Sequence, residues 1–180
     1  PNSLAYEIYK ATTSYGYGMR ANFMQVIAAY NTFNNGGIYI TPKIVDKVYG
    51  NDFEEKVKPE EVKRSISDMT ALRMKNILKK VVEKGTSVGT KLDGLEIGGK
   101  TGTAQNRGQD HSVFMGFAPM DKPKIAIAVY VENGGFGADF AVPIAGVLFE
   151  QYMTGKLSPS AAKQADELQK RRIAYGSHNR

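Results

Sequence analysis

Residues 95–105 read LEIGGKTGTAQ, and the element that this stretch forms decides the fold class of the whole chain. Together with Gly94 it satisfies the phosphate-binding P-loop pattern, which requires a buried strand before the glycines and a helix after them. The preceding residues, GTKLD, are not an apolar strand, and the following residues, GTAQNRG, would form a poor helix. We therefore predict a strand over Leu95–Gln105. A P-loop nucleotide-binding protein is kept only as a remote alternative.

The sequence after this strand predicts two further strands and a closing helix. Ser112–Ala118 and Lys124–Glu132 are rich in apolar and β-branched residues, which are typical of strands. The connection at 119–123 is short and has a proline at each end, so we expect these two strands to pair antiparallel. A helix is predicted over Ala141–Met153 and should end at Gly155.

Two helices are predicted before the first strand. Asn22 is a suitable N-cap, and apolar residues follow it at helical spacing as far as Phe33. A second helix has its apolar face over residues 74–82 and should end at Gly85. We expect Ser65 to be the N-cap of this second helix.

The remaining stretches and the order of the elements indicate the fold class. Pro1–Tyr15 shows no clear period, and Gly50–Pro59 is polar and charged, so we expect a surface loop there. The strands are grouped, with no helix between successive strands. This order indicates an α+β fold in which an antiparallel sheet is backed by helices.

The composition is that of one globular domain and excludes several kinds of site. The chain has 180 residues, of which 42% are hydrophobic, and it contains no apolar run long enough to cross a membrane. The absence of cysteine excludes disulfides, thiolate metal sites and a cysteine nucleophile. His111 and His178 lie too far apart in the sequence to form a zinc site by themselves. No metal site and no cofactor is predicted.

The net charge of +6 is concentrated at the C-terminal end. Residues 154–180 contain six basic and two acidic residues, which accounts for four of the six net charges. We therefore divide the chain into a body, residues 1–153, and a basic, polar C-terminal tail, residues 154–180. A nucleic-acid partner is not predicted, because such proteins spread their basic residues over a folded face.

The candidate functional motif is Lys100-Thr101-Gly102-Thr103. A site that holds the carboxylate of a peptide needs a cation and hydroxyl donors, which Lys100, Thr101 and Thr103 supply. Gly102 removes a side chain where a substrate backbone must approach, and the edge of a strand can pair with that backbone. The alternative interpretation is an ordinary surface strand with an exposed lysine.

The segments around this motif favour the functional interpretation. Lys-Thr-Gly is typical of β-lactamases and penicillin-binding proteins, and the flanking segments resemble those of class B, monofunctional penicillin-binding proteins from about Ala11 to Met153. Five matches in the right order make this resemblance specific. The five segments are Ser14–Gly18 with Phe23–Gln25, Asn34–Gly37 with Thr41–Ile44, Glu83–Thr86 with Gly89 and Thr90, Ile97–Gln105, and Phe114–Pro119 with Val131–Gly135.

The resemblance implies the C-terminal part of a transpeptidase domain with the penicillin-recognising, β-lactamase-like fold. In the peptidoglycan D,D-transpeptidase reaction, a serine attacks the penultimate D-alanine carbonyl of a stem peptide, D-alanine leaves, and an amine of a neighbouring stem accepts the acyl group. Lys100 would belong to the proton and carboxylate network. Thr103 would bind the carboxylate and place its backbone N–H in the oxyanion hole. Thr101 and Gly102 would complete the substrate-binding strand.

The resemblance also implies partners and a location. The partners would be the peptidoglycan stem peptide, β-lactams that mimic it, and the remainder of the parent transpeptidase chain. No metal, cofactor or nucleic acid is implied, and no membrane segment lies in this chain. The implied location is the periplasm or another extracytoplasmic side of the bacterial inner membrane, with an anchor upstream in the parent protein.

The chain departs from the family in its missing motifs. The nucleophile motif, Ser-x-x-Lys, and the second motif, Ser-x-Asn, do not occur before Lys100. Ser160–Lys163 and Ser177–Asn179 match them as strings, but we interpret both as chance matches in a polar tail. We therefore expect this chain alone to be inactive. The alternative is a non-catalytic module that binds cell-wall peptide or a protein partner.

Strand alternation makes one further prediction about the motif. Successive side chains of a strand point to opposite faces, so Lys100 should point away from Thr101 and Thr103. If Lys100 and Thr103 serve the same site, the strand must twist or bulge near Gly102.

Overall fold

The computed structural model describes residues 3–105 and 107–173, and its centre is a three-stranded sheet. Strands β5 (Gly98–Ala104), β6 (His111–Ala118) and β7 (Ile125–Val131) lie in that order and pair antiparallel. All three predicted strands are therefore confirmed, and so is the predicted pairing of the last two. The predicted first strand was too long, because the structure begins it at Gly98.

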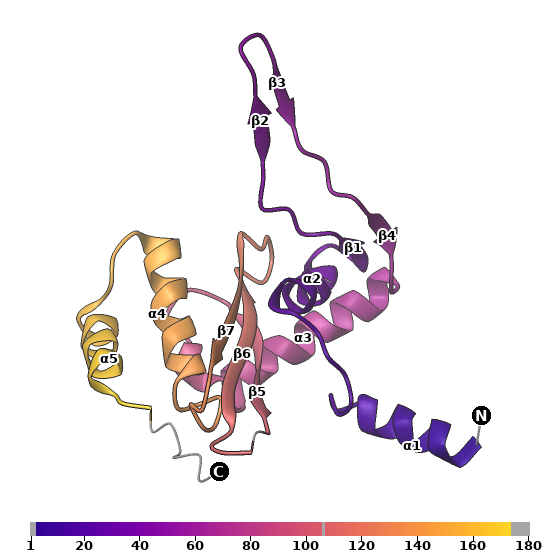
Figure 1. Cartoon of the computed structure of the whole chain (residues 1–180). Coiled ribbons are helices and arrows are strands. Elements are labelled where there is room, and N and C mark those ends of the chain that lie inside the picture. The colour runs from indigo at the N-terminus through magenta and orange to yellow at the C-terminus, as the bar shows by residue number, and fades with distance from the viewer. Residues whose placement is uncertain (1–2, 106, 174–180) are drawn as a thin grey trace.

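Helices cover both faces of this sheet, which confirms the predicted α+β class (Figure 1). Helix α4 (Ala141–Thr154) packs on one face, where the rings of Phe114 and Phe149 meet edge to face at 6.4 Å between centroids. Helices α2 (Phe23–Asn34) and α3 (Asp68–Lys84) lie on the other side. There, a second apolar cluster forms. Its members are Leu78, Phe117 and Met120, with Tyr30, Phe33 and Ala126 packed against them.

The helix caps agree with those predicted from the sequence except in one case. Asn22 forms a capping box with Gln25: the Asn22 side chain accepts from the Gln25 backbone N–H at 2.8 Å, and the Gln25 side chain accepts in return at 2.9 Å. Gly155 ends α4 in the left-handed conformation, as predicted. The predicted cap of α3 was wrong, because Ser67 and not Ser65 accepts the first-turn N–H, that of Thr70, at 3.1 Å.

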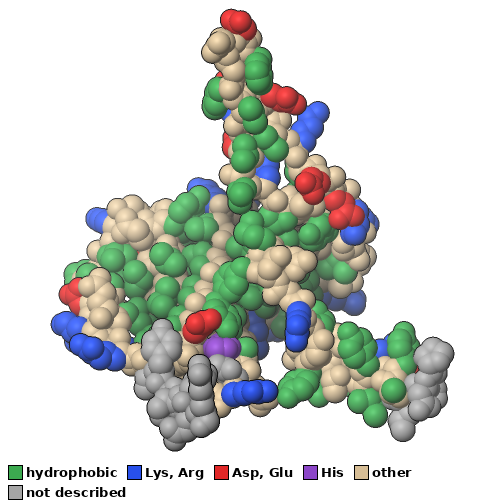
Figure 2. Space-filling view, viewed as in Figure 1, with side chains coloured by type: hydrophobic (Ala, Val, Ile, Leu, Met, Phe, Trp, Pro, Cys, Tyr) green, Lys and Arg blue, Asp and Glu red, His purple; other side chains and the backbone are tan. Residues whose placement is uncertain are grey.

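Two projecting elements were not predicted. Helix α1 (Ser3–Thr13) and a hairpin of β2 (Lys47–Tyr49) and β3 (Glu54–Lys56) extend away from the body (Figure 1). The hairpin contradicts the loop expected over Gly50–Pro59. Apolar side chains on both elements are exposed to solvent (Figure 2). Neither element buries an apolar face. Their sequences therefore lack the regular spacing of apolar residues by which a helix or strand is recognised.

The segment predicted as a polar tail contains a helix. Helix α5 (Pro159–Lys170) begins after the N-cap Ser158 and packs against α4, burying Ala161. The Arg171 side chain donates to the backbone carbonyl of Asp139. The chance match Ser177–Asn179 lies outside the described residues. Among the helices within 3–105 and 107–173, none is long and apolar enough to cross a membrane.

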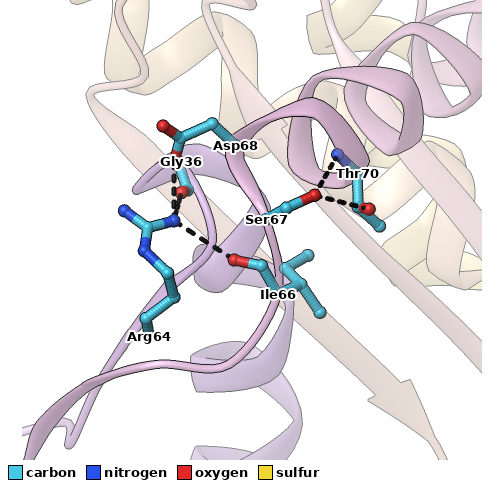
Figure 3. A network of polar contacts seen from close by, with 6 residues as sticks. All are labelled: Gly36, Arg64, Ile66, Ser67, Asp68 and Thr70. Atoms are coloured by element: carbon cyan, nitrogen blue, oxygen red, sulfur yellow. Dashed lines mark hydrogen bonds and ion pairs between the residues drawn. The ribbon is translucent and has the colours of Figure 1, made fainter.

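Arg64 joins three segments on the α2–α3 side of the molecule (Figure 3). It lies on β4 (Val62–Arg64), which pairs with β1 (Ile38–Ile40). Its Nη1 donates to the carbonyl of Gly36 at 2.8 Å, to the carbonyl of Ile66 at 3.2 Å and to the Asp68 carboxylate at 2.6 Å. The turn after α2, strand β4 and the first turn of α3 are thereby held together.

We expect Arg64→Ala to lower the free energy of unfolding by about 1–2 kcal/mol, because two backbone carbonyls and a largely exposed ion pair lose their donor. Asp68→Asn removes only the charge of one partner and should cost clearly less. Arg73→Ala is the matched control, since the side chain of this exposed arginine makes no hydrogen bond or ion pair within the part of the chain that the structure describes. Urea denaturation measures the free energy of unfolding of the three variants. Equal decreases for Arg64→Ala and Arg73→Ala would contradict the role of Arg64.

Candidate functional site

The candidate motif lies on β5, which is an end strand of the sheet. The pairing with β6 runs without interruption from Gly98 opposite Phe117 to Ala104 opposite His111. The strand has no bulge at Gly102, so the bulge considered from the sequence is not present. One long edge of β5 is paired with β6, and no other strand in the described part of the chain pairs with the opposite edge.

Lys100 reaches this unpaired edge by folding back along its own strand. Its Nζ donates to the Thr101 carbonyl at 2.7 Å and to Thr101 Oγ1 at 3.1 Å. The carbonyl of Thr101 is thus directed away from β6 and toward the unpaired edge. Because backbone groups of alternate residues in an antiparallel strand point the same way, the N–H and C=O of Thr103 face this edge too.

The structure places the four motif residues in different ways. Lys100 and Thr101 are brought together, whereas no direct contact joins Lys100 to Thr103 among the described residues. Thr103 is exposed, with its backbone opposite Ser112. Lys100 and Thr103 can therefore meet a common ligand along the edge of β5 without a bulge, the first through its long side chain and the second through its backbone and hydroxyl.

Glycine occurs at three positions of β5 for two different physical reasons. A Cβ at Gly98 would lie 2.6 Å from Met120 Sδ, and one at Gly99 would lie 2.5 Å from Phe114 Cζ, so packing requires both glycines. A Cβ at Gly102 would come no closer than 3.4 Å to Val113, which is an ordinary contact. The fold of this chain therefore does not demand glycine at 102, and close approach of a ligand is a physical reason for it.

Electrostatics distinguish Lys100 from the other lysine near this strand. Lys79 of α3 pairs with Glu96, just before β5, and this hydrogen bond raises the pKa of Lys79. Within the described residues no carboxylate pairs with Lys100. No carboxylate of the described residues therefore neutralises the positive charge of Lys100.

Two neighbouring segments complete the surroundings of the motif. Thr86, in the turn after α3, lies 2.8 Å from Thr101 between hydroxyl oxygens. The Tyr17 hydroxyl donates to Gln105 Oε1 at 3.3 Å, which brings the glycine-rich segment 14–18 to the end of β5. Sequence reasoning did not assign a site role to Thr86, and only the docking of α3 on the sheet reveals this contact.

The loop over residues 132–140 is anchored to the sheet by Ser112 and His111. Ser112 is fully buried; its Oγ donates to the Phe136 carbonyl at 2.9 Å and accepts from the Ala141 N–H, at the start of α4, at 3.0 Å. His111 Nδ1 accepts from the Asn133 N–H at 3.0 Å. His111 is thereby assigned a structural role in holding the loop.

The other sequence patterns are not supported by their surroundings. Gly98–Ala104 is a strand and not a helix, which rules out the P-loop alternative. Ser160 lies in the first turn of α5 and lines a cavity of about 550 Å³ with α4, which stands between α5 and the sheet (Figure 1). Lys163 pairs with Glu167 at 3.9 Å and makes no hydrogen bond to Ser160 within the described residues. No group of three or more potential metal ligands is found in the described chain.

The family model of the penicillin-binding protein transpeptidase domain matches residues 1–154. The chain belongs to the penicillin-binding protein transpeptidase family. This confirms the predicted class B transpeptidase region and the predicted α+β fold of the penicillin-recognising transpeptidases.

Two curated relatives and a solved structure agree with the family. Stage V sporulation protein D of Bacillus subtilis is 35% identical over 153 residues, covering 77% of this chain and 24% of that protein. Peptidoglycan D,D-transpeptidase MrdA of Acinetobacter baumannii is 31% identical over 155 residues, covering 76% of this chain and 23% of that protein. The imipenem acyl-enzyme complex of penicillin-binding protein A from M. tuberculosis superposes with a TM-score of 0.67 at 27% identity, covering 79% of this chain and 33% of that chain. The chain spans about a quarter of the length of the two curated relatives.

Gly137 sets how closely the loop over residues 132–140 lies on β5 and β6. A Cβ there would lie 2.7 Å from the Val113 carbonyl, 2.8 Å from Thr101 Cβ and 3.0 Å from the Gly102 carbonyl. We expect Gly137→Ala to lower the free energy of unfolding by about 1–3 kcal/mol, the usual cost of overpacking, because backbone of two paired strands would have to move. Gly108→Ala is the control, since a Cβ there meets nothing within 4 Å. Equal thermal stability of the two variants would disprove the close packing.

Proposed function

We propose that this chain is the substrate-binding part of a peptidoglycan D,D-transpeptidase, with the nucleophilic serine supplied by another part of the full-length protein. The observation that carries the proposal is the unpaired edge of β5, to which Lys100 Nζ and the outward backbone of Thr101 are directed. MrdA bears the name of this activity, and the acyl-enzyme structure of penicillin-binding protein A holds a β-lactam. Both support the proposal.

Substrate binding follows from the edge of β5. An extended stem peptide aligns beside the strand and uses the outward N–H and C=O groups of Thr101 and Thr103. Lys100 attracts the terminal carboxylate, and the Thr103 hydroxyl donates a hydrogen bond to it. Gly102 lets the peptide backbone approach closely. β-Lactams, which carry a carboxylate in a similar place, bind in the same way.

Acyl transfer then uses the same residues in two steps. The serine oxygen forms a bond to the penultimate D-alanine carbonyl carbon while its proton passes to a neighbouring base, and the Thr103 N–H donates to the oxyanion that forms. The C–N bond breaks, and D-alanine leaves with a proton on its amine. An amine of a second stem peptide attacks the acyl-enzyme, which restores the serine and forms the cross-link. Lys100 stabilises the negative charge and takes part in the proton network.

The substrate determines where the protein works. Peptidoglycan is assembled outside the cytoplasm, so the proposed location is the extracytoplasmic side of the bacterial inner membrane, with an anchor elsewhere in the full-length protein. The partner of this chain at the active site is then the part of the same protein that carries the serine.

Replacing Lys100 tests the assignment directly. In a full-length protein that contains this chain, Lys100→Ala should lower the second-order rate constant of β-lactam acylation by about tenfold or more, since a charge-assisted contact of about 1.5–3 kcal/mol is lost. Lys124→Ala is the matched control, because Lys124 is exposed at the start of β7 and away from the motif. Stopped-flow acylation with a chromogenic penicillin measures both. Wild-type kinetics for Lys100→Ala would refute the role of Lys100.

The isolated 180-residue chain tests the location of the nucleophile. We expect it not to be labelled by a fluorescent penicillin, because Ser160 lies on α5 without an activated lysine beside it. A full-length protein with upstream Ser-x-x-Lys and Ser-x-Asn segments should be labelled with one adduct per chain. Intact mass spectrometry measures the mass of the covalent adduct on each of the two proteins. An adduct on Ser160 would overturn this assignment, and a full-length protein without any adduct would instead favour a non-catalytic peptide- or partner-binding module.

A further inference from the structure

Thr86, Thr101 and Lys100 form a continuous chain of polar contacts at the unpaired edge of β5. The hydroxyl oxygens of Thr86 and Thr101 lie 2.8 Å apart, and Lys100 Nζ lies 3.1 Å from Thr101 Oγ1. We propose that Thr86 is a positioning residue for Lys100 and acts through the Thr101 hydroxyl. This inference rests on the proposed function of Lys100 in binding the substrate carboxylate.

Chemistry fixes the direction of one of the two contacts. The ammonium group of Lys100 can only donate, so Thr101 Oγ1 must accept from it. Either hydroxyl can be the donor in the Thr86–Thr101 contact, because Thr101 Oγ1 keeps both its proton and a second lone pair after it accepts from Lys100. Contact with Thr86 thereby keeps a lone pair of Thr101 directed at Lys100.

The segment around Thr86 is built to hold this hydroxyl still. Gly85 ends α3, and a Cβ there would lie 2.8 Å from the Val81 carbonyl, so the chain turns tightly just before Thr86. Ser87 follows and is fully buried, and its carbonyl accepts from the buried Thr90 hydroxyl at 2.8 Å. Thr86 is thus exposed to the site from a turn that is fixed on both sides.

The short helix after this turn fixes it to the rest of the body. Residues Val88–Thr90 form a single helical turn that packs against α4. A Cβ at Gly89 would lie 2.7 Å from Val142, and one at Gly146 would lie 3.0 Å from the Gly89 carbonyl. This close glycine-mediated packing links the position of Thr86 to α4, which lies against the central sheet.

Lys100 needs such support because little else fixes it. Its side chain is long and flexible, and within the described residues its contacts are the two oxygens of Thr101. Thr101 is β-branched, so its side chain has few conformations, but its hydroxyl proton rotates freely unless a partner holds it. Thr86 is the partner that the structure provides.

The test uses a full-length protein that contains this chain and measures the second-order rate constant of acylation by a penicillin. Thr86→Val keeps the shape but removes the hydroxyl, and we expect the rate constant to fall about three- to tenfold, the effect of one lost hydrogen bond. Thr86→Ser restores the hydroxyl and should return the rate constant to within about twofold of wild type. Thr32→Val is the matched control: it removes a buried hydroxyl that bonds only within α2, to the Ala28 carbonyl at 3.1 Å, so it should leave acylation unchanged.

A double-mutant cycle with Thr101→Val decides whether Thr86 acts through Thr101. If it does, Thr86→Val should have no further effect on acylation once the Thr101 hydroxyl is gone, whereas an independent, structural effect would add to that of Thr101→Val. Circular dichroism melting curves show whether each variant is folded. Additive losses, or wild-type acylation of folded Thr86→Val, would overturn the inference.

These outcomes are distinct from failure of the proposed function itself. If the wild-type full-length protein is not acylated, or Lys100→Ala acylates at the wild-type rate, the proposed function fails. If wild type is acylated and Lys100→Ala is slow while Thr86→Val is unchanged, the role of Lys100 stands and only the role of Thr86 is lost.

Discussion

The pairing of β5 with β6 is the constraint on which the other features of the site depend. Seven consecutive residue pairs join the two strands, and this register determines which backbone groups of β5 face β6 and which face the unpaired edge. Gly98 and Gly99 allow the rings of Phe117 and Phe114 to lie against the start of β5, so the strand is also fixed on its faces. A shift by one residue would turn the N–H and C=O groups of Thr101 and Thr103 toward β6 and leave the edge without them.

Charge at this edge is local and does not come from the net charge of the chain. Residues 154–180 account for four of the six net positive charges, and none of these residues belongs to β5. Near β5, the charge of Lys79 is neutralised by Glu96, whereas Lys100 has only neutral oxygens as partners within the described residues. An anion at the edge of β5 would therefore meet the charge of Lys100 without competition from a carboxylate that is paired with Lys100 in the described residues.

The sequence predicted those parts of the fold that bury an apolar face or stop at a glycine. Strands β6 and β7 alternate, α2 begins at Asn22 and α4 ends at Gly155, and each of these signals is local. Helix α1 and the β2–β3 hairpin could not be found this way, because their side chains are largely exposed and leave no period. For the site, alternation indicates which face of a strand a side chain occupies, but not that Lys100 turns back to the edge or that Thr86, from another element, meets Thr101.

In the proposed function, substrate binding and bond making belong to different parts of the protein. Lys100 and Thr103 lie on β5, Thr86 follows α3, and the loop over 132–140 is held by the buried Ser112. All four parts are positioned by the sheet and its helices, and none of them depends on a serine nucleophile for its place. Groups that bind a substrate contribute most to catalysis when they are already oriented before the reaction. An edge that is preformed in this way would bind the reacting peptide correctly as soon as a nucleophile is brought to it. The same independence explains how this part of a transpeptidase can keep its architecture although the chain has no Ser-x-x-Lys motif ahead of Lys100.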